Sequence, residues 1–278
     1  MSGARPRPRP RLLRVLRVVD LTPRMRRFTL GGDDLIGFPG GSEGAHIKLL
    51  FPDASGETPL LPSLGERGPV WPEHAVRPHV RTYTVVRIDP DANEIDVDIV
   101  LHGDDGPASR WAMRAGVGDP LGLAGPGGPD LFQGHAQRFV LIGDPSSYPL
   151  LFAVIAKLPV PAQVDVLIEV PDASEVQPLP PHPRLNAQWL SRHGGPAGAS
   201  RLLFDAVRKL PWNEAETVSV TLAGESAQVV AIRDFLAEVR GVPRRMMYAV
   251  PYWKDRWDED RYHDERHRIM DAFDEVAA

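Results

Sequence analysis

Residues 81–103 read RTYTVVRIDPDANEIDVDIVLHG and contain two alternating stretches separated by a turn. Polar residues alternate with β-branched or aromatic residues before Asp89 and again after Asn93, which is the period of a β-strand. The segment between them is rich in turn-forming residues. The stretch therefore predicts an antiparallel β-hairpin, and the first half of the chain is organised around it.

Strand patterns flank this hairpin on both sides. LLRVLRVVDLT, MRRFTLGGDDL and HIKLLFP precede it, and DPLGLAGP follows a short helix that we predict near residues 108–114. Six strands with few helices indicate a small antiparallel Greek-key β-barrel, a fold that closes its own edges. Gly125-Pro126-Gly127-Gly128 follows the last predicted barrel strand. Its proline and its position after that strand favour a turn that links two domains.

From Gln137 onward the pattern changes to apolar strands separated by helices. Such alternation predicts an α/β domain with a parallel sheet, right-handed crossovers and ligands at the carboxyl ends of the strands. We expect a barrel domain over residues 1–134 and an α/β domain over residues 135–278, the latter with a C-terminal helical extension.

Composition excludes several classes of protein. The 278 residues include no cysteine, which rules out disulfides, iron–sulfur clusters and cysteine nucleophiles, so redox chemistry requires an organic cofactor. The net charge of −5 gives no general affinity for nucleic acid or anionic membranes. No apolar stretch is long enough to span a bilayer, and the arginine- and proline-rich start, with Arg5, Arg7 and Arg9, is predicted to be a frayed arm. We expect a cytoplasmic monomer.

The first four residues of the hairpin, Arg81-Thr82-Tyr83-Thr84, combine side chains that suit a flavin nucleotide. On a regular strand Arg81 and Tyr83 face one side, and Thr82 and Thr84 face the other. An arginine fork can bind a pyrophosphate oxygen, a tyrosine ring can stack on a flat heterocycle, and a threonine hydroxyl can hydrogen-bond to its polar edge. A barrel strand with an exposed arginine has the same pattern, so both interpretations stay open.

Residues 101–112, LHGDDGPASRWA, add a pattern that suits a phosphate. The pairs His102-Gly103 and Gly106-Pro107 allow the backbone to approach a ligand closely. Ser109 falls near a predicted helix start, where backbone amides lack intrahelical acceptors.

Together these motifs resemble the flavin-binding half of the siderophore-interacting proteins, FAD-dependent ferric-siderophore reductases related to ferredoxin reductases. The resemblance covers nearly the whole chain and rests on the order and spacing of its motifs. They are LTPRMRRFTLGG, HIKLLFP, RTYT, LHGDDGPASRWA, LAGPGG, IGD, LAGES and YAVPYWKDRWDED. Two departures concern the second half: Pro145-Ser146-Ser147 stands where the family usually has an acidic residue and a threonine, and Pro251 stands where glycine is common.

The resemblance implies an enzyme that moves electrons from NADH, NADPH or another donor through FAD to a ferric siderophore. It implies no catalytic acid, base or nucleophile, and no resident metal. Flavin suits this task because it accepts a two-electron hydride and can release electrons singly. The residues implied to bind FAD are Arg81, Thr82, Tyr83, Thr84, His102, Gly103, Gly106, Ala108, Ser109 and Trp111.

A nicotinamide nucleotide site is expected where two strands of the second half end. An ordinary strand-to-helix loop with a serine cap has the same sequence, and no G-x-G-x-x-G is present; the resemblance favours the nucleotide site. Its predicted residues are Gly143, Asp144, Ser146, Ser147, Gly224 and Glu225.

Three cations are candidates for binding an anionic ferric chelate: Lys48, Lys254 and Arg256. A protein of net negative charge needs local positive charge to hold such a ligand, and in the family basic residues from both domains line an open substrate cleft. The alternative is that all three are solvated surface charges, which we favour for Arg256.

Two further patterns receive a structural interpretation. His263 and His267 are four residues apart on a predicted helix, a spacing that can bind a metal, but a strongly charged C-terminal helix usually carries such histidines on its solvent-exposed face. No nucleophilic serine elbow or paired carboxylate favours a hydrolase.

The sequence therefore predicts an FAD-dependent ferric-siderophore reductase. Two alternatives remain open: a flavoprotein that sequesters ferric siderophore with little turnover, and a general flavin reductase that serves other acceptors. The altered segment Pro145-Ser146-Ser147 is the main support for sequestration.

Overall fold

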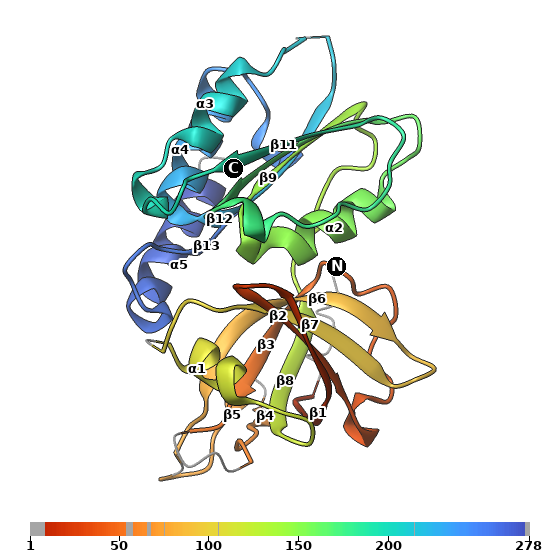
Figure 1. The fold of residues 1–278 in the computed structure, drawn as a ribbon, viewed down its shortest axis with the longest axis vertical. Coiled ribbons are helices and arrows are strands. Elements are labelled where there is room, and N and C mark those ends of the chain that lie inside the picture. The colour runs from red at the N-terminus through yellow and green to blue at the C-terminus, as the bar shows by residue number, and fades with distance from the viewer. Residues whose placement is uncertain are drawn as a thin grey trace. The chain divides into compact units, whose positions relative to one another are not determined.

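Six strands of the first half of the chain close into an antiparallel barrel in the order β1-β2-β7-β6-β3-β8, as the alternating patterns predict (Figure 1). The computed structural model describes residues 9–53, 58–65, 68–74, 76–104, 106–213 and 215–275, so Arg5 and Arg7 of the predicted arm lie outside the described residues. The barrel strands are β1 (Arg11–Thr22), β2 (Met25–Gly31), β3 (His46–Phe51), β6 (His79–Asp89), β7 (Glu94–Val100) and β8 (Pro120–Gly127). Helix α1 (Pro107–Arg114) lies between β7 and β8 in the chain.

The predicted hairpin is confirmed as β6 and β7, and its alternation fills the barrel. Ile95, Val97 and Ile99 of β7 are fully buried, as are Phe28 of β2 and Ile47 of β3. Because successive side chains of a strand point to opposite faces, these residues line the interior while their neighbours face outward. At about 25 cal/mol per Å² of apolar area, this shared core is the main source of the barrel's stability.

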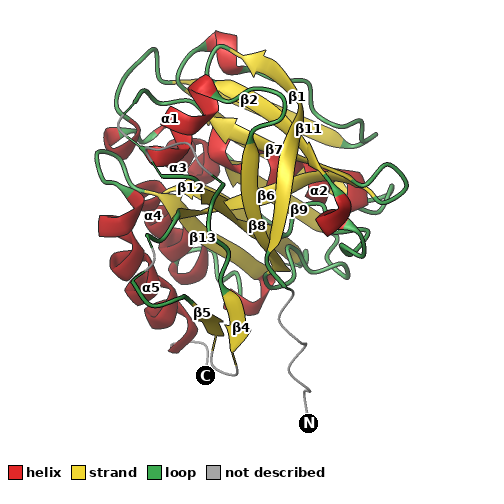
Figure 2. Ribbon diagram, turned by 90° about the horizontal axis from the view of Figure 1, so that it is seen from below, coloured by secondary structure: helices red, strands yellow, loops and turns green. Residues whose placement is uncertain are grey.

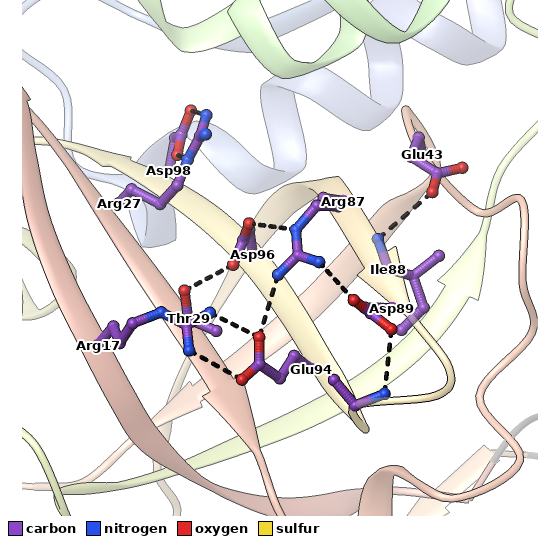
Figure 3. Close-up of polar contacts among 11 residues, drawn as sticks. Arg17, Arg27, Thr29, Glu43, Arg87, Ile88, Asp89, Glu94, Asp96 and Asp98 are labelled. Atoms are coloured by element: carbon purple, nitrogen blue, oxygen red, sulfur yellow. Dashed lines mark hydrogen bonds and ion pairs between the residues drawn. The ribbon is translucent and has the colours of Figure 1, made fainter.

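The outward face of β7 carries carboxylates that neighbouring strands cover with arginines. Asp98 accepts two hydrogen bonds from the Arg27 guanidinium, at 2.7 Å from Nε and 2.8 Å from Nη2 (Figure 3). Asp96 accepts hydrogen bonds from Thr29 Oγ1 at 2.7 Å and from Arg87 Nε at 2.8 Å. Both aspartates are buried although they belong to the outer face: Asp96 is 6% exposed and Asp98 is 7% exposed.

The network of charged side chains continues to the start of β7. Glu94 accepts a forked pair of hydrogen bonds from Arg17 and a further one from Arg87, which also binds Asp89 (Figure 3). Burial raises the pKa of Asp98, and the hydrogen bonds from Arg27 oppose that rise. We call Arg17, Arg27, Arg87, Glu94, Asp96 and Asp98 the barrel charge ladder.

The second half of the chain forms a parallel sheet of five strands in the order β11-β10-β9-β12-β13, which confirms the predicted α/β architecture. Within this domain α2 lies on one face of the sheet, and α3 and α4 lie on the other (Figures 1 and 2). The strands are β9 (Arg138–Gly143), β10 (Gln163–Val170), β11 (Leu185–Ser191), β12 (Val218–Glu225) and β13 (Met247–Trp253). The helices are α2 (Tyr148–Lys157), α3 (Leu202–Lys209), α4 (Ser226–Glu238) and α5 (Glu259–Glu275).

The strand order reverses direction between β9 and β12. In an open parallel sheet this reversal separates the loops that follow two adjacent strands, and ligands bind in the crevice between them. Gly143-Asp144 and Gly224-Glu225 end these two strands, so the predicted nucleotide residues do fall at the switch point.

The glycine-rich segment at residues 125–128 differs from its prediction as a linking turn. Strand β8 continues through Gly127, which pairs with His46 across an irregularity in the ladder. A Cβ on Gly127 would lie 3.0 Å from His46 Nε2, and one on Gly128 would lie 2.9 Å from His46 Nδ1. The glycines are therefore needed for the close approach of an imidazole. The chain divides into two compact units between Pro129 and Asp130, whereas we placed the boundary after Gly134.

The proline-rich stretch before β6 contains a small hairpin, β4 (Ser63–Gly65) and β5 (Gly68–Val70), that we did not predict. Its strands are too short to show an alternating pattern. Among the described helices, none is both long and apolar enough to cross a membrane.

Candidate flavin and substrate sites

Strand β6 presents Arg81 to Thr84 opposite strand β3. Lys48 is the direct partner of Thr82 in the ladder, and its Nζ donates a hydrogen bond to Thr82 Oγ1 at 2.5 Å. Arg81 Nη1 donates to the Val80 carbonyl at 2.9 Å. Lys48 and Thr82 thus share one face of the sheet, and the alternation assigns Arg81 to the opposite face.

Tyr83 belongs to an aromatic cluster at the barrel core. Its ring lies edge-on to Phe51 with centroids 6.0 Å apart, and Phe51 is in turn 5.4 Å from Trp111. Trp111 of α1 also packs 4.9 Å from Phe28. Tyr83 and Trp111 are only partly buried where they pack against this core. The sequence did not reveal this cluster, because its members come from four different elements.

The loop before α1 is organised by Ser109. Its Oγ accepts a hydrogen bond from His102 N at 3.1 Å and donates one to the Gly103 carbonyl at 2.7 Å. Ser109 is fully buried, so its hydroxyl supports the loop. Gly103 has φ 93°, a left-handed conformation that favours glycine.

The start of α1 has the donors that a pyrophosphate requires. Gly106 precedes the helix, no side chain caps it, and Pro107 at the first helical position has no N–H. The backbone amides of Ala108 and Ser109 therefore have no intrahelical acceptor and face the N-terminal end of α1. The Ala108 side chain packs into the barrel core. A Cβ on Gly106 would lie 3.0 Å from His102 Cε1, so only glycine fits beneath that imidazole without displacing it.

These groups fit FAD. Helix α1 packs against β3, β6 and β7, which brings its open N-terminal amides to the same barrel as Arg81 and Tyr83. Amides and a guanidinium bind phosphate oxygens, and a partly exposed tyrosine ring can stack on a flavin. The structure places the predicted flavin residues on β6, on α1 and in the loop before α1, with Thr82 on the opposite face of β6 from Arg81, and it gives Ser109 and Ala108 structural side chains.

In the second domain, Asp144 ties three strands together at the switch point. Its Oδ1 accepts hydrogen bonds from Ser146 N at 2.9 Å and from Ser146 Oγ at 2.5 Å. Its Oδ2 accepts from Glu225 N at 2.9 Å and from Trp253 Nε1 at 2.8 Å. Asp144 is 5% exposed, and burial raises its pKa against the effect of these hydrogen bonds. One carboxylate thereby joins the ends of β9, β12 and β13.

The glycines at this edge accommodate the same side chains. A Cβ on Gly143 would lie 2.0 Å from Ser147 Oγ, and one on Gly224 would lie 2.6 Å from Asp144 Oδ2. Ser147 is fully buried and donates to the Asp144 carbonyl at 2.7 Å. The structure brings all six predicted nucleotide residues to one edge, where their side chains already bind one another.

Glu225 satisfies the helix that follows it. Its carboxylate accepts hydrogen bonds from Ala227 N at 2.7 Å and Gln228 N at 3.2 Å, which caps α4, and from Asp255 N at 3.2 Å. Another buried carboxylate lies on β10, which β9 separates from β12: Glu169 is 1% exposed. It accepts hydrogen bonds from Ser200 and Gln228 and forms an ion pair with Arg192, and burial raises its pKa. The edge is therefore acidic and its helix amides are satisfied by the chain itself.

The predicted substrate cations of the second domain follow β13. Lys254 Nζ lies 2.5 Å from Glu265 Oε1 and 4.0 Å from the centroid of the Trp257 ring. Arg256 is exposed and has φ 63°, which places a non-glycine residue in the left-handed region. Sequence analysis missed the pairing of Lys254, because Glu265 is eleven residues later on a separate helix.

His263 and His267 lie side by side on α5 with ring centroids 4.5 Å apart, and both are exposed. Within the residues that the structure describes, no group of three or more histidine, aspartate or glutamate side chains is arranged to hold a metal ion.

Comparison with known proteins identifies the chain's relatives. Residues 14–130 match the model of the siderophore-interacting FAD-binding domain, and residues 136–256 match that of the siderophore-interacting protein. The chain belongs to the siderophore-interacting protein family. The family predicted from the sequence is thus confirmed, and the barrel is the family's FAD-binding domain.

Two named relatives resemble the chain over most of their length. Ferric vibriobactin reductase ViuB of Vibrio cholerae is 38% identical over 272 residues, which cover 98% of this chain and 99% of ViuB. The NADPH-dependent ferric-chelate reductase of Escherichia coli is 34% identical over 247 residues, 87% of this chain and 92% of that protein. The crystal structure of the siderophore-interacting protein SipS from Aeromonas hydrophila matches with a TM-score of 0.80 and 34% identity, covering 95% of this chain and 99% of SipS.

Proposed function

We propose that this protein catalyses the FAD-dependent reduction of ferric siderophores, with NADH or NADPH as the electron donor. The observation that carries the proposal is the end-to-end similarity to a ferric vibriobactin reductase, on a fold whose barrel has the donors that FAD needs. A ferric-chelate reductase among the relatives is named as NADPH-dependent, which supports a nicotinamide donor. We also propose a cytoplasmic monomer, which cell fractionation and size-exclusion chromatography would test.

The barrel residues would hold FAD by complementary contacts. Arg81 and the open amides at the start of α1 would bind the pyrophosphate, and Tyr83 would stack on the flavin ring. Bound FAD supplies the conversion of a two-electron hydride into single-electron transfers. The other predicted residues are Thr82, Thr84, His102, Gly103, Gly106, Ala108, Ser109 and Trp111, of which Ser109 and Gly106 shape the loop.

The cations Lys48, Lys254 and Arg256 are proposed to bind the ferric chelate. Many ferric chelates are anionic, and local positive charge on a protein of net charge −5 would concentrate them. Reduction lowers the charge of the iron and weakens its attraction to anionic oxygen ligands, so the metal leaves the chelate. Raising salt from 0.1 M to 1 M shortens the Debye length from about 10 Å to about 3 Å, so reduction of an anionic chelate should slow.

Two measurements test the main proposal. The purified protein should be yellow and release FAD on denaturation. With NADH or NADPH and a ferric siderophore, it should then produce ferrous iron that a ferrous-specific chelator traps. A colourless protein that cannot be reconstituted with FAD would contradict the flavin assignment. A yellow protein that releases no ferrous iron with any donor would contradict the reductase assignment.

The donor site is proposed at Gly143, Asp144, Ser146, Ser147, Gly224 and Glu225, with weak affinity. Replacing Ser146 with alanine should slow flavin reduction by a nicotinamide nucleotide. The matched control is Ser174→Ala, because Ser174 donates to Asp172 through the same two contacts, from its backbone N at 3.0 Å and from Oγ, in the loop after β10. If Ser146→Ala reduces flavin at the wild-type rate with both nucleotides, this site is wrongly assigned.

A second candidate function is a flavoprotein that holds ferric siderophore with little turnover. It is favoured by the edge of the parallel sheet, where Asp144 and Glu225 already satisfy the amides that a nucleotide phosphate would use. A general flavin reductase is a third possibility, separable by its acceptor profile. Stopped-flow mixing with NADH or NADPH distinguishes turnover from storage, because only a reductase bleaches its flavin absorbance rapidly.

A further inference from the structure

A carboxylate of the C-terminal helix neutralises the cation that we assign to substrate in the second domain. Lys254 and Glu265 form an ion pair with 2.5 Å between Nζ and Oε1, and each side chain is 27% exposed. The Lys254 ammonium also lies over the Trp257 ring, whose centroid is 4.0 Å away. The Arg261 guanidinium carbon lies 3.9 Å from the same centroid. We call Lys254, Trp257 and Glu265 the lysine latch.

The segment that carries Lys254 is held firmly at both of its neighbours. Trp253 donates its indole N–H to Asp144 at 2.8 Å. Asp255 donates its backbone N–H to Glu225 at 3.2 Å and accepts a hydrogen bond from Gly198 N at 3.1 Å. Because these contacts fix the backbone on each side, the position of the ammonium depends on the partner that its flexible side chain finds.

Helix α5, which carries Glu265, is docked by two buried aromatic residues. Tyr262 is fully buried, and Phe273 is 7% exposed. The guanidinium groups of Arg233 and Arg244 lie 4.7 Å and 4.6 Å from the Phe273 centroid. Glu265 lies one turn after Tyr262, so the docked helix delivers its carboxylate to Lys254.

We propose that Glu265 is a specificity-determining residue, an internal anion that competes with an anionic ferric chelate for Lys254. The inference rests on the proposed substrate role of Lys254. While the latch is closed, the pair is neutral and gives an incoming anion little attraction. A strongly charged chelate can displace the carboxylate, whereas a weakly charged one gains little by doing so. Glu265 therefore lowers the affinity of the protein for anionic chelates and does not change its affinity for neutral chelates.

The expected size of the effect follows from the exposure of the pair. A partly exposed ion pair contributes modestly, so its removal should change the affinity for an anionic chelate by about twofold to fivefold. That factor corresponds to about 0.4 to 1 kcal/mol. The change should be visible in both binding and reduction, because Lys254 acts before electron transfer.

The test uses two ferric chelates of different charge and the full chain with FAD bound. Ferric tris-catecholate is trianionic, whereas a ferric tris-hydroxamate core is neutral. Quenching of tryptophan fluorescence gives the Kd of each, and ferrous trapping gives KM and kcat. The variant Glu265→Gln should bind the trianionic chelate about twofold to fivefold more tightly and bind the neutral one as wild type does. Adding Glu265→Gln to Lys254→Ala should give no gain, because the competing pair no longer exists.

Glu259→Gln is the matched control. It removes one negative charge from the same helix, and Glu259 pairs with Arg266 at 3.0 Å without contacting Lys254. If Glu259→Gln gives the same gain, the effect comes from net charge and the inference fails. A looser trianionic complex in Glu265→Gln would mean that Glu265 positions Lys254, which also overturns it.

The same variants separate this inference from the proposed function. If Lys254→Ala weakens the trianionic chelate but Glu265→Gln has no effect, the latch is refuted and the substrate role of Lys254 stands. If Lys254→Ala binds both chelates as wild type does, Lys254 is not part of the substrate site, and the inference fails too. Equal melting temperatures of wild type and Glu265→Gln would show that neither result comes from unfolding.

Discussion

Replacing Arg27 with methionine should destabilise the barrel, because the change leaves Asp98 without its cation. The Asp98 side chain is 4% exposed and accepts both of its hydrogen bonds from the Arg27 guanidinium, at 2.7 Å and 2.8 Å. Methionine retains most of the apolar stem of arginine and removes only the donors. Water has little access to replace those donors at this degree of burial.

Two arguments set the magnitude of the loss at pH 7. Breaking a buried ion pair by removing one partner costs about 3 to 5 kcal/mol. The loss has an upper limit, because the Asp98 carboxyl can take up a proton once Arg27 is gone. Protonating a carboxyl at pH 7, roughly three units above its unperturbed pKa, costs about 4 kcal/mol at about 1.4 kcal/mol per unit. We therefore expect the free energy of unfolding to fall by about 3 to 4 kcal/mol.

The loss should shrink as pH falls. Burial already raises the pKa of Asp98 in the wild-type protein, and removing Arg27 takes away a contact that opposes this rise. The folded variant then keeps a proton that the unfolded chain has released, so its free energy of unfolding falls as pH rises through that window. Between pH 5 and pH 7 the loss should grow by up to about 1.4 kcal/mol per unit.

Urea unfolding followed by circular dichroism at pH 5 and pH 7 measures both effects. With a slope of about 1 to 3 kcal/mol per molar urea, the midpoint of the barrel transition should fall by at least about 1 M at pH 7. Arg17→Met is the control, since Arg17 forms the same fork with Glu94 but is 53% exposed, and it should change little. Arg27→Met combined with Asp98→Leu should recover most of the loss. A loss below about 1 kcal/mol, or a larger loss at pH 5 than at pH 7, would refute this reasoning.

Two further predictions concern the flavin site. Arg81→Ala should raise the Kd for FAD by about 10-fold to 150-fold, since a hydrogen bond to a charged group is worth about 1.5 to 3 kcal/mol; reconstitution of the apoprotein measures it, and unchanged affinity would remove Arg81 from the site. Gly106→Ala should lower FAD affinity severalfold, because the new Cβ would lie 3.0 Å from His102 Cε1 and displace the loop before α1. Gly116→Ala is its control, because a Cβ there meets nothing within 4 Å, and equal effects of the two changes would contradict the prediction.

The architecture was predictable because periodicity follows burial. The alternation in β6 and β7 indicates strands with one face in the barrel, and the predominantly apolar sequences of β9 and β10 indicate strands covered on both faces. The glycines after Leu123 were misassigned for a related reason. Glycine and proline mark turns in general, and only the pairing of β8 with His46 shows that a strand requires them here.

The barrel charge ladder was not predictable from the same alternation. Asp96 and Asp98 occupy the polar positions of β7, which normally face water, and the sequence gives no sign that both are buried. Their burial comes from Arg87 on β6, the other strand of the hairpin, and from Arg27 on β2, a strand that becomes a neighbour of β7 only through the order of the closed barrel. Pairing across strands of distant sequence is the information that a single sequence lacks.

The edge of the parallel sheet shows why a carboxylate and a phosphate site look alike in sequence. Open amides at a helix start are satisfied equally well by a ligand phosphate or by the chain's own side chain. Here Asp144 accepts four hydrogen bonds and Glu225 caps α4. A dinucleotide phosphate that took these donors would leave a buried carboxylate without them, at a cost comparable to breaking a buried ion pair. If the electron donor binds at this edge, as we propose, it should contact only the rim and bind with correspondingly low affinity.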